Sequence, residues 1–513
     1  MDQDTPAARP NVLIVMFDQV APTALGAYGN PVTHAPTLDR LAREGVVFDA
    51  AYSNSPLCTP ARYCMMTGQL PSATRGYDNA AYLASTIPTF AHHARLAGYR
   101  TVLDGKMHFV GADQLHGFEE RRTTDIYPAD FGWTPDWLQA DERIDWWFHN
   151  MDSVTQAGVA EVTNQLLYDD EVGHQGVRAL HDLARADDDR PWLLVVSFTH
   201  PHDPYVTRGR YWDLYEGKDI PLPQLTADDV ALDPHTARLR KVSAMDEVQI
   251  TDDDVRNARR AYYGNISYLD EWTERLTGTL DALGVADDTI VVLLADHGDM
   301  LGERGLWYKM NFFEGSARVP LIVHSPTRFK PKRVAAPVSL VDVLPTITEL
   351  AGVETPDGPD TLAGRSLLGM CEGRAAAGPA VEREVVGEYM GEGAIAPIVM
   401  IRRGDLKYVH SPVDPDQLYD LEVDPHERLN LAADPDWSAR LKEFRDRVDR
   451  DWDMDALFAD VVADQARRRL VNAALRTGTV TPWDYTPPSD GTTEYMRNHL
   501  DLNVVEQSAR FPR

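Results

Sequence analysis

Short runs of apolar residues recur along the chain, and segments with helical spacing lie between them. The runs are continuous rather than alternating, and they occupy 12–17, 101–103, 192–198, 289–295 and 321–324. Continuous apolarity is typical of strands that are buried on both faces of a sheet. Helical spacing is present in 37–45, 89–98, 169–185, 254–283 and 341–351. The pattern predicts an α/β fold in which helices sandwich a large sheet.

The composition changes after the last of these helices. Residues 352–377 are rich in Gly, Pro and small side chains, which is typical of a linker or surface loop. Two short strands at 398–402 and 406–410 then indicate a hairpin, and a helical stretch follows at 437–469. We therefore expect three parts: a main domain at 1–370, a smaller α+β domain with an antiparallel sheet at 380–475, and an extended C-terminal tail at 476–513.

The charge balance excludes several classes of partner. The chain has 513 residues, with 80 Asp and Glu against 50 Lys and Arg, and its formal net charge is −30. Such an excess of negative charge disfavours binding to nucleic acid or to anionic membrane surfaces. Residues Cys58, Cys64 and Cys371 are too few for a disulfide framework, and the polar N-terminus resembles no signal peptide or membrane span. We expect a soluble, cytoplasmic protein.

Polar side chains follow four of the predicted strands. In chain order, these residues are Asp18 and Gln19, Lys106 and His108, His200 and His202, and Asp296 and His297. In open α/β sheets ligands bind outside the carboxyl ends of the strands, so four such endings that converge would form a site. Each residue alone is also compatible with a helix cap, a turn or a structural histidine. Together, the oxygen and nitrogen donors suit a divalent cation.

A cysteine lies directly before a predicted helix that begins with proline. In the pattern Cys58-x-Pro60-x-Arg62, the guanidinium follows four positions after the thiol. A helix N-terminus with a guanidinium nearby binds anions, and it is expected to lower the pKa of the Cys58 thiol. Taken by itself, Cys58 is equally compatible with a small buried apolar residue.

These segments together resemble the sulfatase family of the alkaline phosphatase superfamily. The motifs that carry the resemblance occur in order along most of the chain: Cys58-Thr59-Pro60-Ala61-Arg62, Thr67-Gly68, Gly105-Lys106-Met107-His108, Ala295-Asp296-His297-Gly298 and 417–425. The resemblance implies an alkaline phosphatase-like fold with 1–370 as the catalytic domain. Within the family, 113–120, 125–130, 144–147 and 495–499 resemble the choline-sulfatases. A sulfuric ester hydrolase that cleaves choline O-sulfate to choline and sulfate is therefore expected.

The resemblance also implies a modified nucleophile. A formylglycine-generating enzyme would oxidise Cys58 to formylglycine, and the hydrate of that aldehyde would attack sulfur with one hydroxyl and expel sulfate with the other. Arg62 would stabilise the diol, and Lys106 and Lys309 would hold sulfate oxygens. His108 would accept a proton during sulfate release. His202, preferred to His200, would protonate the departing alkoxide together with Lys309.

By the same resemblance, four residues would hold one divalent metal ion, which activates the diol: Asp18, Gln19, Asp296 and His297. The common site of the family has Asp in place of Gln19 and Asn in place of His297. One carboxylate fewer and one imidazole more shift the preference from Ca²⁺ toward Mn²⁺. Ca²⁺ remains the first expectation on family grounds, with Mn²⁺ as the alternative.

The choline end of the substrate needs a different surface, because a quaternary ammonium is met best by aromatic faces and carboxylates. The candidates in stretches that resemble choline-sulfatases are Trp133, His149, Asn150 and Glu392. Glu392 is preferred to Glu388, which is expected to face solvent from a strand. The aromatic pair Trp146 and Trp147 is interpreted as core.

Three further hypotheses concern assembly and alternative functions. The tail at 476–513 is expected to reach a neighbouring subunit of a homo-oligomer, a dimer or a tetramer. A phosphonate monoester or phosphodiester hydrolase of the same superfamily would share the nucleophile and the metal site. An inactive relative that binds a choline-type ligand is a third interpretation, against which the joint presence of the expected catalytic residues argues.

Overall fold

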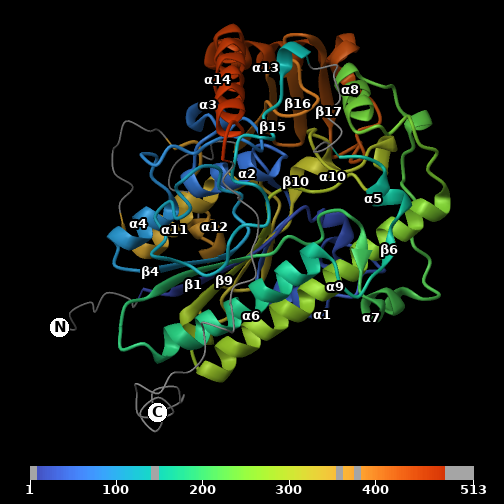
Figure 1. Cartoon of the computed structure of the whole chain (residues 1–513). Helices are drawn as coiled ribbons and strands as arrows, with labels where there is room; N and C mark the ends of the chain where they lie inside the picture. Colours follow the sequence, from blue (N-terminus) through green and yellow to red (C-terminus); the bar gives the residue numbers. More distant parts are fainter. Residues whose placement is uncertain (1–8, 140–148, 354–361, 375–382, 480–513) are drawn as a thin grey trace.

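An eight-stranded mixed sheet forms the centre of the molecule in the computed structural model, which describes residues 9–139, 149–353, 362–374 and 383–479 (Figure 1). The strand order is β12-β2-β11-β9-β1-β7-β4-β5. The strands of this sheet are β1 (Asn11–Phe17), β2 (Val46–Phe48), β4 (Arg100–Gly105), β5 (Glu120–Arg121), β7 (Trp192–Ser197), β9 (Thr289–Ala295), β11 (Leu321–His324) and β12 (Lys332–Val334). All five apolar runs of the sequence are strands here, which confirms the predicted sheet.

Four central strands, β9, β1, β7 and β4, are parallel neighbours. Antiparallel β11 pairs with both β9 and β2, which makes the sheet mixed. Smaller sheets pair β10 (Arg318–Val319), β3 (Ala51–Tyr52) and β13 (Val338–Ser339), and β6 (Gly158–Val159) with β8 (Val206–Thr207). Because β9, β1, β7 and β4 run parallel, their carboxyl ends lie at the same edge of the sheet.

Helices cover both faces of the large sheet, as the sequence predicted (Figure 1). One face packs against α1 (Pro36–Glu44), α6 (Asn164–Arg185) and α9 (Asp252–Leu283), and the other against α2 (Cys58–Thr67), α4 (Phe90–Leu96), α11 (Val343–Ala351) and α12 (Leu368–Glu372). Shorter helices are α3 (Pro71–Thr74), α5 (Asp152–Thr155), α7 (Gly209–Trp212), α8 (Pro234–Val242) and α10 (Glu314–Ala317). Helix α6 begins five residues before the predicted start, because the Thr163 side chain caps it by accepting from the Leu166 N–H.

The C-terminal part is built on a four-stranded antiparallel sheet of β14 (Glu384–Tyr389), β15 (Ile398–Arg403), β16 (Leu406–Ser411) and β17 (Asp414–Asp420). Strands β15 and β16 form the predicted hairpin. Side chains of this sheet and of α13 (Ser438–Asp451) make a core of their own, which includes Val399, Tyr408 and Phe444.

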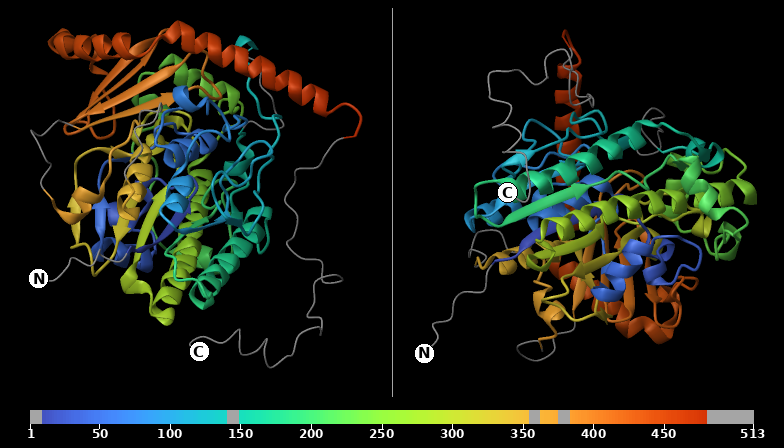
Figure 2. Two further views of the ribbon diagram at one scale, coloured as in Figure 1. Left: turned by 90° about the vertical axis from the view of Figure 1, so that its left-hand side faces the viewer. Right: turned by 90° about the horizontal axis from the view of Figure 1, so that it is seen from below.

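The single helical stretch predicted at 437–469 is wrong, because two helices occupy it. Trp452 is extended (φ −125°) and ends α13, and the Asp453 side chain caps α14 (Met454–Leu475) by accepting from the Ala456 N–H. The Trp452 indole also donates to Glu388 at 2.7 Å, which holds the break against β14. Helix α14 extends over the main body of the molecule (Figure 2).

The division into 1–370, 380–475 and 476–513 stays a prediction. The tail from residue 480 onward, and with it 495–499, lies outside the described residues, as do 144–147 and the pair Trp146 and Trp147. Within the described ranges, no helix combines the length and apolarity that a bilayer crossing requires.

Candidate active site

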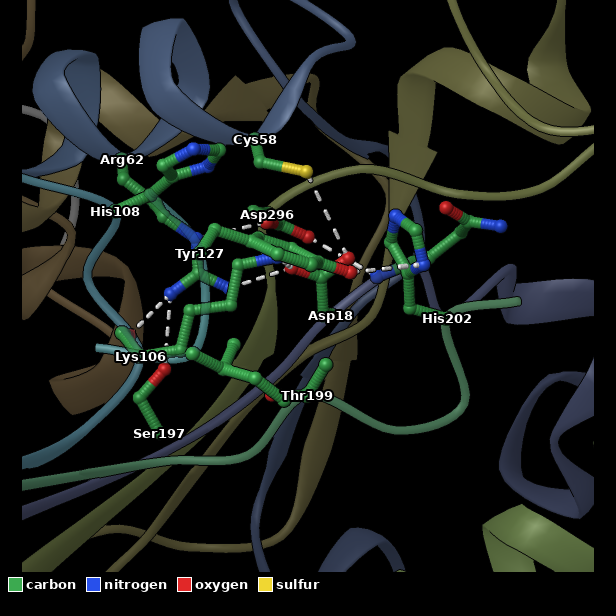
Figure 3. A network of polar contacts seen from close by, with 12 residues as sticks. Asp18, Cys58, Arg62, Lys106, His108, Tyr127, Ser197, Thr199, His202 and Asp296 are labelled. Atoms are coloured by element: carbon green, nitrogen blue, oxygen red, sulfur yellow. Dashed lines mark hydrogen bonds and ion pairs between the residues drawn. The ribbon is translucent and has the colours of Figure 1, made fainter. Parts of the chain in front are cut away.

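The polar residues that follow β1, β4, β7 and β9 lie together at one edge of the sheet (Figure 3). The side chains of Asp18, Lys106 and Asp296 are fully buried there, and His202 is 7% exposed. Parallel strands end at the same edge, so residues far apart in the sequence become neighbours. Cys58 reaches the same place from the first turn of α2.

The Cys58 thiol lies beside two of the expected metal ligands, His297 and Asp18. Its Sγ lies 3.3 Å from His297 Nε2 and 3.9 Å from Asp18 Oδ1. Burial, together with the negative charge of Asp18, raises the pKa of the Cys58 thiol to about 12. The expectation of a lowered thiol pKa is therefore wrong, since desolvation outweighs the helix N-terminus and the nearby cations. At neutral pH this thiol is protonated and is a poor nucleophile.

Arg62 joins the two aspartates. Its Nε donates to Asp296 Oδ2 and its Nη2 to Asp18 Oδ2, each at 2.9 Å, and its Nη1 donates to Ser197 Oγ at 2.9 Å. The Lys106 ammonium also pairs with Asp18 Oδ2. Burial by itself would raise the pKa of Asp18, but the neighbouring cations, Lys106 first, hold it well below its usual value. Asp18 is therefore a carboxylate in the folded protein.

The donor atoms of Asp18, Cys58, Asp296 and His297 all lie within 4.8 Å of one another. His297 Nδ1 lies 3.0 Å from the Gly298 carbonyl and donates to it, which leaves Nε2 with its lone pair toward the carboxylates. Burial lowers the pKa of His297 to about 4, so the imidazole is neutral. Two carboxylates and a neutral imidazole are a donor set that fits a divalent cation.

Gln19, the fourth expected metal ligand, makes hydrogen bonds on both sides of its amide. Its Oε1 accepts from Lys309 Nζ at 2.6 Å, and its Nε2 donates to Asp299 Oδ2 at 2.7 Å. Its backbone lies in the left-handed region (φ +69°), and its N–H donates to Asp296 Oδ1 at 3.0 Å. Gln19 thus links the donor cluster to Lys309.

The two histidines after β7 have different surroundings. His202 Nε2 accepts from Lys309 Nζ at 2.7 Å, and its Nδ1 donates to the Asp203 carbonyl at 2.7 Å. His200 instead lies 2.6 Å from the Asp169 carboxylate and does not line the cavity described below. Burial and the charge of Lys309 lower the pKa of His202 well below its usual value, so its ring is neutral.

The His108 ring makes contacts with aromatic side chains. Neither ring nitrogen has a hydrogen-bond partner among the described residues, and the backbone is left-handed (φ +58°). The ring lies against Tyr127 and Trp133, with centroids at 5.3 and 5.7 Å. Burial and the charge of Lys106 lower the pKa of His108 to about 3. The neutral ring is available to accept a proton.

A cavity of about 280 Å³ opens onto part of this site. Its lining includes Cys58, His202 and Lys309, and it also includes all four residues expected at the choline end: Trp133, His149, Asn150 and Glu392. The cavity therefore joins the four residues expected at the choline end to three of the expected catalytic residues. Arg62, Lys106, His108 and the four expected metal ligands are not among the described residues that line it.

The two candidate glutamates differ in position. Glu392 Oε2 is buried without a hydrogen-bond partner among the described residues, and burial raises its pKa to about 7. Glu388 lines another cavity, of about 760 Å³. The expectation that Glu388 faces solvent is wrong: it is 1% exposed and accepts from Ser72 and Trp452, because α3 and the α13–α14 junction pack over β14.

Three residues of the site were missed by the sequence reasoning. The Tyr127 ring lies 4.2 Å from Lys106 Nζ, a cation–π contact. Asp203 lies 3.2 Å from His149 Nδ1 and accepts from Ser153 Oγ at 3.1 Å. Asn79 Oδ1 accepts from the Thr59 N–H at 3.0 Å, next to Cys58. Tyr127 lies inside the motif at 125–130 and Asp203 follows His202, whereas no local pattern points to Asn79.

Comparisons with known proteins agree with this geometry. The model of the sulfatase family matches residues 10–353, that of the choline sulfatase enzyme C terminal matches 459–511, and that of the N-sulphoglucosamine sulphohydrolase C-terminal region matches 302–452. The chain is 51% identical to a choline-sulfatase of Rhizobium meliloti (strain 1021) over 98% of this chain and 99% of that protein. It is 28% identical to an arylsulfatase of Clostridium perfringens over 85% of this chain and 93% of that protein.

Solved structures share the fold. A phosphonate monoester hydrolase of Agrobacterium radiobacter superposes with a TM-score of 0.69 at 24% identity, covering 88% of this chain and 96% of that one. The large mixed sheet, the buried donor cluster beside Cys58 and the match over residues 10–353 all lead to one assignment. The chain therefore belongs to the sulfatase family of sulfate ester hydrolases.

Proposed function

We propose that this sulfatase hydrolyses choline O-sulfate to choline and sulfate, with formylglycine formed from Cys58 and one divalent metal ion. The observation that carries the proposal is the shared cavity of about 280 Å³, in which Cys58 and Lys309 lie with Trp133 and Glu392. The Lys309 ammonium, which lies in the cavity with Cys58, suits an anionic ester group. The Trp133 ring and the Glu392 carboxylate suit a quaternary ammonium. The 51% identity to a choline-sulfatase supports the same substrate.

The formylglycine and the divalent cation would supply different parts of the chemistry. When formed, the formylglycine hydrate supplies a nucleophilic hydroxyl and a second hydroxyl for sulfate release, and a bound divalent cation supplies Lewis acidity. The donors that would hold the cation are Asp18, Asp296 and His297, with Gln19 adjacent. Ca²⁺ is proposed first and Mn²⁺ as the alternative, because the imidazole favours the softer ion.

The chain's own residues bind the sulfate group and manage its protons. Arg62 holds the carboxylates of Asp18 and Asp296 in place, while the Lys106 and Lys309 ammonium groups offer positive charge to sulfate oxygens. His108, whose ring nitrogens have no hydrogen-bond partner in the described part of the chain, accepts a proton when sulfate leaves. The Lys309 ammonium, hydrogen-bonded to His202 Nε2, delivers a proton to the departing alkoxide.

A panel of esters tests the proposal directly. We expect kcat/KM for choline O-sulfate to exceed that for 4-nitrophenyl sulfate and for a phenyl phosphonate monoester, measured on enzyme of known formylglycine and metal content. A phosphonate monoester turned over as well as choline O-sulfate would contradict the proposal and favour the alternative hydrolase. Metal analysis of the same sample decides between Ca²⁺ and Mn²⁺. Maturation by a formylglycine-generating enzyme, the homo-oligomer and the cytoplasmic location stay predictions.

The pH dependence of binding provides a second test. Because the raised pKa of Glu392, about 7, keeps its carboxyl protonated at lower pH, the negative charge that attracts the ammonium is lost as pH falls through about 7. We expect KM for choline O-sulfate to rise about tenfold per pH unit below that value, measured by steady-state kinetics. E392Q is expected to raise KM and to flatten this profile.

E388Q is the matched control, since Glu388 is also buried but lines the other cavity. Its KM profile should follow the wild type. A flattened profile in E388Q and an unchanged one in E392Q would reverse the assignment of the ammonium-binding carboxylate.

The proposed role of His202 in protonating the leaving group is tested by comparing two esters with different leaving groups. An alkoxide needs a proton as it departs, whereas 4-nitrophenolate leaves without one. We therefore expect H202A to lower kcat/KM about 10²- to 10³-fold for choline O-sulfate and far less for 4-nitrophenyl sulfate. H200A is the control: loss of the Asp169 contact should lower stability without changing the ratio between the two substrates. Equal losses on both esters in H202A would contradict the role.

A further inference from the structure

A buried arginine of α14 reaches the wall of the substrate cavity. Arg468 is 5% exposed, and it lies within the residues that match the choline sulfatase C-terminal model. Its Nη1 and Nη2 donate to the two carboxylate oxygens of Asp78, each at 2.7 Å, and Nη1 also donates to Thr134 Oγ1 at 3.2 Å. A bidentate pair of this kind defines the relative position of two segments in distance and in angle.

Two of the hydrogen-bond partners of Arg468, Asp78 and Thr134, are direct neighbours of cavity residues, and a third, Asp464, lies on α14 itself. Asp78 precedes Asn79, which lines the cavity and accepts from the Thr59 N–H beside Cys58. Thr134 follows Trp133, which lines the same cavity and packs against Tyr127 at 5.3 Å. One guanidinium thus holds two stretches of the cavity wall that are more than 50 residues apart in the sequence.

Other side chains of α14 contact the same two stretches. Gln465 Oε1 accepts from the Trp137 N–H at 3.0 Å, and the Phe458 ring stacks on Trp137 at 5.9 Å. Asp460 Oδ2 accepts from the Tyr77 hydroxyl at 2.7 Å. Between β5 and Trp137 the described chain has no helix or strand of its own. Trp133 lies in a turn in which the Thr134 N–H donates to the Phe131 carbonyl at 3.2 Å. The buried, charged side chain of Arg468 ties this turn to α14.

We propose that Arg468 is a positioning residue that determines substrate preference, because its contact with Thr134 holds the neighbouring Trp133 where the cavity can bind the ammonium end of the ester. The inference rests on the proposed function. Cation–π attraction depends on the distance and orientation of the ring, so a displaced Trp133 binds the ammonium more weakly. The sulfate end is held by residues at the strand ends and by α2, which Arg468 reaches only indirectly, through Asp78 and the neighbouring Asn79.

The test compares R468Q, R468K and wild type on choline O-sulfate and on 4-nitrophenyl sulfate, which has no ammonium group. We expect R468Q to raise KM for choline O-sulfate at least about tenfold, and to change kcat on either ester by less than about twofold. R468K is expected to recover part of the KM, since it keeps the buried charge without the bidentate geometry. R467Q is the matched control: Arg467 is the next residue, with a side chain that is 57% exposed.

Formylglycine content and thermal unfolding are measured on every variant, so that maturation and folding are separated from binding. Should R468Q fail to fold, the double variant D78N/R468Q removes both charges of the buried pair and is compared in the same way. Equal increases in KM on both esters, or an unchanged KM for choline O-sulfate in a folded variant, would overturn the inference. A wild-type enzyme without preference for choline O-sulfate would instead overturn the proposed function.

Discussion

Replacement of Cys58 by alanine is expected to abolish sulfate release, with kcat lower by about 10⁶-fold. The reason is that position 58 is the first residue of α2 and faces the donors of Asp18 and His297, where the nucleophile must lie. Burial raises the pKa of the unmodified thiol to about 12, which keeps it protonated at neutral pH, so we expect activity to require the proposed oxidation to the aldehyde. Sulfate release from choline O-sulfate measures the effect.

C64A is the matched control for this variant. Cys64 is also on α2 and fully buried, and burial raises the pKa of its thiol well above the usual value. The charge that acts on it is that of Glu388 rather than those of the donor cluster. We expect C64A to keep its activity. Mass spectrometry of the peptide that contains residue 58 should find an aldehyde; an intact thiol in fully active enzyme would contradict the mechanism.

D18N is expected to lose its metal ion and at least about 10³-fold in kcat/KM. Asp18 contributes a carboxylate oxygen to the donor cluster, and its other oxygen accepts from Arg62 and pairs with Lys106. Without this negative charge, two buried cations lie beside the metal site with one carboxylate fewer to balance them. Metal content by elemental analysis and activity on choline O-sulfate are measured together.

D270N separates this effect from a general cost of changing a buried aspartate. Asp270 is 4% exposed and accepts from the N–H groups of Thr37 and Leu38 at the start of α1, away from the donor cluster. We expect D270N to lose stability but to retain its metal. A D18N protein that binds the metal with wild-type stoichiometry would show that Asp18 is not a ligand.

Much of the fold could be predicted because its signals are local. The run at 289–295 is exactly as long as β9, and the hairpin at 398–410 follows from two apolar stretches around a turn. The break between α13 and α14 could not be predicted in this way. The local cap at Asp453 is one acidic residue among several in this stretch, and the break is also held by the Trp452 indole, which donates to Glu388, a residue 64 positions away.

The candidate site shows the same division. Asp18, Asp296, His297 and Cys58 were identified from short motifs, since each motif lies where a strand ends or a helix begins. The resemblance already favoured His202 over His200, and the tertiary structure supplies the contacts that separate them. His202, which pairs with Lys309, and His200, which pairs with Asp169, differ only in what surrounds them.

The sequence by itself determined where the buried strands lie along the chain and which polar residues follow them. It also contained the motifs of the sulfatase family. These features depend only on neighbours in the chain. Only the tertiary structure decided the quantities that depend on burial and on distant charges. It raised rather than lowered the pKa of Cys58, placed Glu392 in the cavity and Glu388 outside it, and brought Arg468 to Asp78. Desolvation and long-range ion pairing arise only when segments distant in sequence pack together.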